Sequence, residues 1–436
     1  MKVVKVGLLG LGTVGGGTVN VLTKNSQNIA RRSGCLIKVI SASARDLSRE
    51  RICATDGIQL TDRPEDIIKD PEIQIIVELM GGEEPAKSLI LEALSLGKHV
   101  VTANKALIAN HGNELFEAAS KNKVTLAYEA AIAGGIPIVK AMREGLSANS
   151  IDWLAGIING TGNFILTEMR DKGSAFDDVL KEAQALGYAE ADPEYDVEGI
   201  DAAHKLCILA SLAFGMPLNF KRVYTEGISK ITPLDVTYAE ELGYRIKHLG
   251  VAKKTDQGVE MRVHPTLIPE KRLIANVDGV MNAVLVKGNA VGPTLYYGAG
   301  AGAEATASAV IADIVDICRQ LDLSSDTAVP ALGFSPDALE ELPILSIEEI
   351  ETAFYLRLSV EDKPGVMAAI TKILADNGIS IEAVQQKEPE QHGANAQVIL
   401  LTDQVIEKSL ITALAEIESL DSIIESAVRI RVESLE

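Results

Sequence analysis

The sequence predicts an α/β protein in three parts: a doubly wound parallel sheet, an α+β domain with a mixed sheet, and a small C-terminal α+β domain. Three observations support this fold class. A glycine-rich turn directly follows the first strand-like segment, strand-like and helix-like segments alternate through residue 130, and a β-α-β-β-α-β order closes the chain. A length of 436 residues suits about three domains, each large enough to bury a core.

The first part opens with a buried strand predicted over Lys2 to Leu9. Gly10-Leu11-Gly12-Thr13-Val14-Gly15 follows at once, and a helical pattern begins directly after it. Strand, G-x-G-x-x-G and helix in this order are the dinucleotide-binding fingerprint of Rossmann-type sheets. The glycines let the backbone approach a pyrophosphate, whose charge lies at the helix N-terminus. We expect cofactor contacts from Gly10, Gly12, Thr13, Val14 and Gly15.

The end of the second predicted strand, Leu36 to Ser43, bears on the choice of cofactor. An NAD-specific domain usually places an acid there to bind the ribose hydroxyls. This chain has Arg45 instead, which suits the 2′-phosphate of NADP, whereas the neighbouring Asp46 keeps NAD possible. The alternative is that Arg45 is only a solvated loop residue. The sequence therefore favours NADP without excluding NAD.

Two further loops follow predicted parallel strands. One is Leu79-Met80-Gly81-Gly82 and the other is Thr102-Ala103-Asn104-Lys105. Open α/β sheets bind their ligands at the carboxyl ends of the strands. We therefore expect Gly81 and Lys105 to lie beside the cofactor.

A run of carboxylates, from Gly187 onward, leads into a helix that we expect to be buried, because Leu206 to Phe214 is apolar nearly all round. Asp201 and Lys205 stand one turn apart on one face of this helix. Burying such a pair is costly unless a polar group requires it, and a cleft for a small charged substrate would supply that group. A salt pair on a solvated surface is the alternative.

A second glycine-rich turn, Gly298 to Glu304, opens a helix predicted from Ala305 to about Leu321. It is not a second dinucleotide fingerprint, because no βαβ unit carries it. Gly302 either closes over the cofactor or allows the helix to pack on a sheet.

The C-terminal part is predicted to be a separate domain. Three prolines mark residues 326–350 as a linker, and the segments after it follow the ferredoxin-like order β-α-β-β-α-β. The expected division is a cofactor domain over residues 1–130 with about 305–325, a middle domain over 131–304, and a C-terminal domain over 351–436.

Composition argues against several kinds of partner. The formal charge of −20, without a cluster of Lys and Arg, opposes binding to nucleic acid or to an anionic membrane. No apolar run is long enough to span a bilayer. The four cysteines lack the spacing of a metal site or a disulfide framework, which is typical of a reducing compartment. We therefore expect a cytoplasmic protein.

These motifs together resemble the bacterial homoserine dehydrogenases of the monofunctional type with a C-terminal ACT regulatory domain. The resemblance implies NAD(P)H-dependent reduction of L-aspartate 4-semialdehyde to L-homoserine, on the route to threonine, methionine and isoleucine. The matching segments are Gly10 to Gly15, Thr102 to Lys105, Glu129 with Ala133 to Pro137, Asn159 to Asn163, Gly187 to Lys205, Asp362 to Val366, and Asn377 to Ile381.

The resemblance also implies roles for individual residues. Lys205 is the candidate proton donor, and partial burial would lower its pKa toward neutral pH. Lys105 is the rival donor, or else it holds the substrate carboxylate or touches the cofactor. Glu190 and Asp201 suit the ammonium group of the substrate, and Asp196 is either a supporting carboxylate or a helix cap. Which lysine donates the proton stays open.

By the same resemblance, the chain has a structural site for a monovalent cation, with Na⁺ favoured. Glu129 is expected there with backbone oxygens of Ile132, Gly134 and Ile136, since one acid in a tight irregular loop suits a hard cation. Gly302 matches a position that contacts the cofactor in this family.

The ACT likeness implies an amino-acid effector, with L-threonine favoured, and a homodimer or homotetramer. The expected effector residues are Gly365, Asn377 and Ile379. Two alternatives remain: another amino-acid or semialdehyde dehydrogenase of the same cofactor fold, and a non-catalytic amino-acid sensor. The two lysines and the paired carboxylates argue against a sensor, which needs no such set in one cleft.

Overall fold

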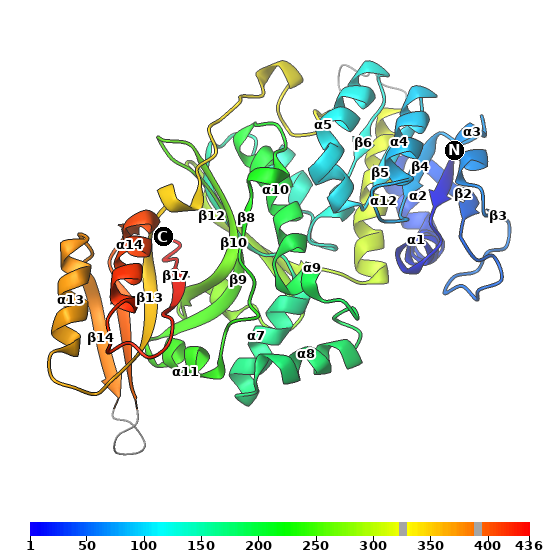
Figure 1. Cartoon of the computed structure of the whole chain (residues 1–436). Coiled ribbons are helices and arrows are strands. Elements are labelled where there is room, and N and C mark those ends of the chain that lie inside the picture. Colours follow the sequence, from blue (N-terminus) through cyan, green and yellow to red (C-terminus); the bar gives the residue numbers. More distant parts are fainter. Residues whose placement is uncertain (322–328, 388–394) are drawn as a thin grey trace. The chain divides into compact units, whose positions relative to one another are not determined.

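The structure, a computed structural model, describes residues 1–321, 329–387 and 395–436 (Figure 1). The start of the expected linker 326–350 and the end of the expected segment 305–325 lie outside these residues. The chain forms two compact units. The first comprises residues 1–160, 201–223 and 280–342, and the second comprises residues 161–200, 224–279 and 343–436.

A six-stranded parallel sheet, in the order β3-β2-β1-β4-β5-β6, is the centre of the first unit. The strand order runs outward in both directions from the neighbours β1 and β4, so the predicted doubly wound sheet is confirmed. Sheets of this kind bind ligands where the order reverses, at the carboxyl edge. The strands are β1 (Lys2–Leu9), β2 (Cys35–Ser43), β3 (Gln59–Thr61), β4 (Ile75–Glu78), β5 (His99–Thr102) and β6 (Leu126–Ala127).

Helices cover this sheet because its strands are apolar on both faces. β4 is buried throughout, as are the last four residues of β1. Helix α12 returns from far along the chain, and its Val310 and Ile314 join Val6 of β1 in one apolar cluster. The helices that belong to this region are α1 (Thr13–Lys24), α2 (Ser26–Ser33), α3 (Pro64–Lys69), α4 (Ala86–Ser95), α5 (Lys105–Lys121) and α12 (Ala303–Gln320).

The rest of the first unit contains three antiparallel strands, β7, β11 and β12, and most of helix α10. α10 runs over Ile200–Phe214, and every residue from Asp201 onward is buried. This confirms the expected burial of the helix. The other elements are β7 (Ile151–Ile157), β11 (Met281–Gly288), β12 (Gly292–Ala299) and the single turn α6 (Ile138–Lys140).

The second unit has a mixed sheet with the order β9-β10-β17-β13-β15-β14 (Figure 1). β9 and β10 are an antiparallel hairpin, and β17 pairs with β10 in parallel. The predicted β-α-β-β-α-β order is confirmed, and its last strand joins it to β10. The strands are β8 (Tyr224–Thr225), β9 (Tyr244–Lys254), β10 (Val259–Pro269), β13 (Glu351–Val360), β14 (Ile381–Lys387), β15 (Ala396–Thr402), β16 (Val405–Ile406) and β17 (Val428–Val432).

One apolar cluster unites this second unit. Phe164 of α7, Ile246 of β9 and Tyr355 of β13 all belong to it. The helices are α7 (Gly160–Lys172), α8 (Phe176–Ala185), α9 (Glu194–Val197), α11 (Pro233–Glu241), α13 (Val366–Asp376) and α14 (Glu407–Glu418). In the part of the chain that the structure describes, no helix combines the length and the apolar character needed to cross a membrane.

The sequence does not predict β9, β12 or α11, and β8 is only two residues long. β9 is missed because its pattern is broken by polar residues that are nevertheless buried. Lys247 donates to Asp278 at 2.9 Å, and His248 contacts the backbone oxygen of Glu226 at 3.0 Å. Partners distant in sequence thus permit polar residues in a buried strand.

The close packing of α1 against the start of α12 generates a prediction. A Cβ atom at Gly17 would lie 2.5 Å from the backbone oxygen of Ala303. We expect Gly17→Ala to lower the free energy of unfolding by about 1–3 kcal/mol in urea unfolding, because one backbone must shift. Gly145→Ala is the control, since a Cβ there meets nothing within 4 Å. Equal losses in the two variants would contradict the prediction.

Candidate active site

The glycine-rich turn after β1 is shaped by close backbone contacts. Gly10 has a φ of +104°, and a Cβ there would lie 2.8 Å from the backbone carbonyl of Leu79. A Cβ at Gly15 would lie 2.3 Å from the backbone oxygen of Gly10. Gly12, by contrast, caps α1, and a Cβ there meets nothing within 4 Å. The turn therefore requires glycine for packing at two positions and stays open at the N-terminus of α1, where Thr13 is exposed.

The segment after β2 leaves Arg45 exposed. The carboxylate of Asp46 accepts hydrogen bonds from the hydroxyl of Ser48 at 2.6 Å and from its amide at 2.9 Å, and these bonds lower the pKa of Asp46. Arg51 donates to the backbone oxygen of Leu11 at 3.1 Å. Asp46 and Arg51 thus have partners within the loop region itself.

A buried carboxylate with two lysines forms the centre of the candidate site, entirely within the first unit. Asp201 is 3% exposed and accepts from Lys105 Nζ at 2.9 Å and from Lys205 Nζ at 2.6 Å. Lys205 also donates to the backbone oxygen of Ile158 at 2.7 Å, and the side chain of Asn159 donates to Asp201 at 2.9 Å. The structure therefore brings the three predicted catalytic residues together.

The charges of this centre are strongly coupled. Burial would raise the pKa of Asp201, but the neighbouring ammonium groups of Lys205 and Lys105 outweigh it and hold the pKa well below its usual range. Lys205 is 8% exposed, whereas the side chain of Lys105 is 35% exposed. The alternative of a solvated surface pair is wrong, because Asp201 and Lys205 are both buried.

The loops after β4 and β5 lie side by side because these strands are neighbours. The side chain of Asn104 donates to the backbone oxygen of Gly82 at 2.5 Å and accepts from the amide of Leu107 at 3.1 Å. Asn104 thus caps α5, whose first residue is Lys105. Gly81 has a φ of +72° in the facing loop.

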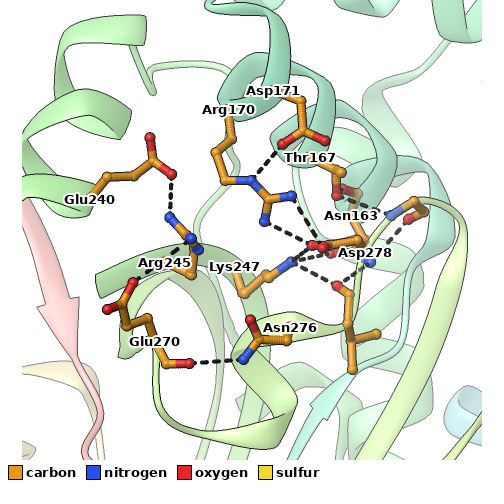
Figure 2. Close-up of polar contacts among 12 residues, drawn as sticks. Asn163, Thr167, Arg170, Asp171, Glu240, Arg245, Lys247, Glu270, Asn276 and Asp278 are labelled. Carbon is orange, nitrogen blue, oxygen red and sulfur yellow. Dashed lines mark hydrogen bonds and ion pairs between the residues drawn. The ribbon is translucent and has the colours of Figure 1, made fainter. Parts of the chain in front are cut away.

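The segment from Asn159 to Asn163 joins β7 to α7, and its two asparagines have different partners. The side chain of Asn159 donates to Asp201, and apart from the motif itself no sequence pattern predicts this role. Asn163 donates to the backbone oxygens of Val277 and Gly279, each at 3.0 Å (Figure 2). The buried Lys247 completes this anchor, and its ammonium lies 2.9 Å from Asp278. The contacts of Asn163 fix the start of α7 and join residues more than 80 positions apart, beyond the reach of local patterns.

Three other predicted residues come from other elements. Glu190 is exposed, and Asp196 is half-buried within α9. Both belong to the second unit. Gly302 is exposed at the N-cap of α12 with a φ of +123°. The positive φ explains a glycine at this position whether or not a ligand binds there.

The carboxylate of Glu129 has backbone partners. It accepts from the amides of Val139 and Lys140 at 2.8 and 2.9 Å, beside Asp313. Burial, and then the nearby charge of Asp313, raise the pKa of Glu129 to about 7. Among the residues that the structure describes, no group of three or more His, Cys, Asp or Glu side chains is arranged to hold a metal ion. The Glu129 carboxylate therefore serves as a cap for the turn at α6.

The loop that follows Glu129 is tight and irregular. Ala133 and Gly134 have consecutive φ values of +50° and +51°, and the backbone oxygen of Ile136 accepts from the amide of Ile138 at 2.8 Å. Ile132, the remaining predicted cation ligand, is buried in the same loop.

The three expected effector residues lie at the two ends of α13. Gly365 is its N-cap, and Asn377 its C-cap, with a side chain that donates to the backbone oxygen of Ile373 at 3.0 Å. Ile379 is buried just beyond. A helix of 11 residues is about 16 Å long, so one small molecule does not touch both ends within a single chain.

A doubly wound parallel sheet, an open helix N-terminus at its glycine turn, and a buried carboxylate between two lysines define a nicotinamide-dependent oxidoreductase. Comparison with known families narrows this class. Residues 10–129 match the family described as homoserine dehydrogenase, NAD binding domain, residues 137–315 match homoserine dehydrogenase, and residues 354–422 match the ACT domain. The chain belongs to the homoserine dehydrogenase family.

Relatives match along the whole chain. It is 60% identical to the homoserine dehydrogenase of Pseudomonas aeruginosa over 435 residues, which is 100% of both proteins. A crystal structure of a homoserine dehydrogenase from Thiobacillus denitrificans superposes with a TM-score of 0.95 at 60% identity, over 100% of this chain and 99% of that one. A hyperthermophilic archaeal homoserine dehydrogenase in complex with NADPH matches with a TM-score of 0.60 at 26% identity, over 72% of this chain and 97% of that one.

The raised pKa of Glu129 predicts a pH-dependent stability. Because the pKa is raised in the folded state, folding takes up a proton between about pH 4.5 and 7, and the contribution of this group to stability falls as pH rises through that window. Glu129→Gln cannot ionise, so the advantage of wild type over the variant should shrink by up to roughly 3 kcal/mol from pH 5 to pH 8. Chemical unfolding of both proteins at several pH values measures this difference in the free energy of unfolding.

The control for this experiment is the exposed Glu117 of α5. Glu117→Gln should leave the difference in stability from wild type nearly constant with pH. A difference for Glu129→Gln that is equally flat would show that its carboxyl group does not change protonation on folding.

Proposed function

We propose that this protein reduces L-aspartate 4-semialdehyde to L-homoserine with NAD(P)H, in the biosynthesis of threonine, methionine and isoleucine. The observation that carries the proposal is the Asp201 carboxylate held between Lys105 and Lys205 at 2.9 and 2.6 Å. Membership of the homoserine dehydrogenase family supports it.

The two lysines provide the proton that this reaction needs. The reduced nicotinamide supplies a hydride when bound, and the aldehyde oxygen then requires a proton. Asp201 holds both ammonium groups close together through its two ion pairs. Lys205 is fixed by Asp201 and the Ile158 backbone oxygen, which orients one donor, while the more exposed Lys105 is the other candidate. The choice between them is left to experiment.

We propose that carboxylates and the lysine that does not donate the proton bind the substrate. Because Asp201 accepts from both lysines, we propose that Glu190, supported by Asp196, is the main partner of the substrate ammonium group. Whichever lysine does not donate the proton would then hold the substrate carboxylate. Replacing Glu190 with Gln should raise KM for the semialdehyde more than it lowers kcat.

For the cofactor we propose a preference for NADP over NAD. Arg45 is exposed at the end of β2, and Asp46, the acid that would favour NAD, accepts hydrogen bonds from Ser48. The dissociation constants of NADPH and NADH, in wild type and in Arg45→Ala, decide this point. We further propose cofactor contacts at Gly12, at Gly81 and, from α12, at Gly302.

A structural monovalent cation, Na⁺, remains a proposal. The Glu129 carboxylate accepts one backbone amide on each oxygen, and its remaining lone pairs are still able to bind a cation. We propose that Glu129 supplies the charged ligand together with backbone oxygens of Ile132, Gly134 and Ile136, and the tight turn at Ala133 and Gly134 is compatible with such a site. Thermal unfolding in NaCl against choline chloride distinguishes a specific site from general salt screening.

The ACT segment supports regulation by an amino acid, and we propose L-threonine as the effector and a homodimer or homotetramer as the assembly. Gly365 lies about 16 Å from Asn377 along α13, so a site with both would need two copies of the chain. A cytoplasmic location also remains a prediction, to which the four free cysteines are suited.

Removal of either lysine tests the proposed reaction. We expect Lys205→Ala or Lys105→Ala, whichever residue is the acid, to lower kcat by roughly 10²- to 10⁴-fold while NADPH still binds. Turnover is measured as the loss of NADPH absorbance in the presence of L-aspartate semialdehyde. Lys121→Ala, at the exposed end of α5, is the matched control and should leave turnover unchanged. A folded wild type that binds NADPH and gives no turnover contradicts the proposed reaction.

The effector proposal has its own test. L-threonine should inhibit the wild-type enzyme and raise its melting temperature, since a ligand that binds only the folded state stabilises it. L-serine at equal concentration is the control. If threonine changes neither activity nor melting temperature, another amino acid or no effector binds the ACT segment.

A further inference from the structure

Glu78, the last residue of β4, is a buried acid that neither the sequence nor the proposed reaction explains. Its side chain is 0% exposed. One carboxylate oxygen accepts from the amides of Met80 and Gly81 at 2.7 and 3.2 Å, and the other accepts from the hydroxyl of Thr102 at 2.7 Å. Because burying an acid is unfavourable, a strand residue of this kind is expected where its hydrogen bonds serve a purpose.

The hydrogen bonds of Glu78 continue to the start of α5. Thr102, the last residue of β5, accepts from the amide of Asn104 at 3.0 Å. Asn104 caps α5 and reaches back to the backbone oxygen of Gly82. Lys105 follows directly and contacts Asp201. The loops after two neighbouring strands are thus connected through hydrogen bonds to one carboxylate. This chain of hydrogen bonds ends at Asn104, one residue before Lys105 of the candidate site.

The same contacts show that the backbone amides of the loop after β4 bind Glu78. The amides of Met80 and Gly81 point toward Glu78, so they are not available to a pyrophosphate. Gly81 and Gly82, with φ values of +72° and +76°, allow this inward turn. Phosphate binding therefore falls to the N-terminus of α1, and the loop after β4 instead fixes the position of its neighbour after β5.

We propose that Glu78 and Thr102 are positioning residues that hold the N-terminus of α5, and with it the ammonium group of Lys105, in place against Asp201. The catalytic consequence rests on the proposed function of this site. A reacting group displaced by about 1 Å can cost roughly 10²-fold in rate. Loss of the Thr102 hydroxyl removes a donor to Glu78 and an acceptor for Asn104 together, which releases this end of the helix.

The test compares Thr102→Val with Thr102→Ser, because valine keeps the shape of threonine and serine keeps its hydroxyl. We expect Thr102→Val to lower kcat/KM for the semialdehyde roughly 10- to 100-fold and Thr102→Ser to stay within about 3-fold of wild type. Ile76→Val, one buried methylene removed from the same strand as Glu78, controls for simple loss of stability. It should leave kcat/KM unchanged.

The double variant Thr102→Val with Lys105→Ala shows whether Thr102 acts by positioning Lys105 or lowers activity in some other way. If Thr102 acts through Lys105, Thr102→Val should cost less than about 3-fold in the Lys105→Ala background. Full additivity of the two losses, equal effects of Thr102→Val and Ile76→Val, or failure of serine to rescue would each overturn the proposal.

The positioning proposal can also be tested without the substrate. If wild type fails to turn over L-aspartate semialdehyde, the proposed function is wrong, and hydrogen exchange of the first backbone amides of α5 becomes the readout for the same variants. Faster exchange there in Thr102→Val and Glu78→Gln, with Thr102→Ser and Ile76→Val like wild type, would still support the link between the two loops. Equal exchange in all of them would overturn it.

Discussion

The candidate site depends on the ion pairs of a single buried carboxylate, that of Asp201. Its two lysines come from different parts of the chain, one from the N-terminus of α5 and one from the next turn of α10. An isolated charge in this position would be severely unfavourable, and an isolated pair would leave one lysine without its partner. The two ammonium groups stabilise the buried carboxylate, and their ion pairs hold α10 against the N-terminus of α5 within the first unit.

Close backbone approach provides the second constraint on this edge of the sheet. Gly10 lies against the backbone of Leu79, and Gly17 lies against Ala303 at the start of α12. Side chains at these positions would push apart the glycine turn, the loop after β4 and the start of α12. The glycines therefore let these backbones lie in contact at the edge where sheets of this kind bind their ligands.

Local patterns in the sequence predicted the parallel sheet, the burial of α10 and the C-terminal β-α-β-β-α-β order, because each depends on residues close together in the chain. They also singled out Lys105, Asp201 and Lys205, although only the fold shows that one carboxylate joins them. Patterns failed at β9, where Lys247 is buried against Asp278. They also do not reveal that the Glu129 carboxylate accepts from amides ten and eleven residues away. In both cases the partner of a polar group is set by tertiary structure.

The second unit shows the same dependence on distant partners. Arg431 of β17 is buried and binds Glu407 of the ACT segment at 2.9 Å and Glu226, next to β8, at 2.7 Å. A buried guanidinium between two carboxylates is favourable only when all partners are in place. Since β17 also pairs with β10, the ACT segment and the β9–β10 hairpin are one cooperative sheet. Any ligand that orders the ACT strands therefore also acts on the β9–β10 hairpin.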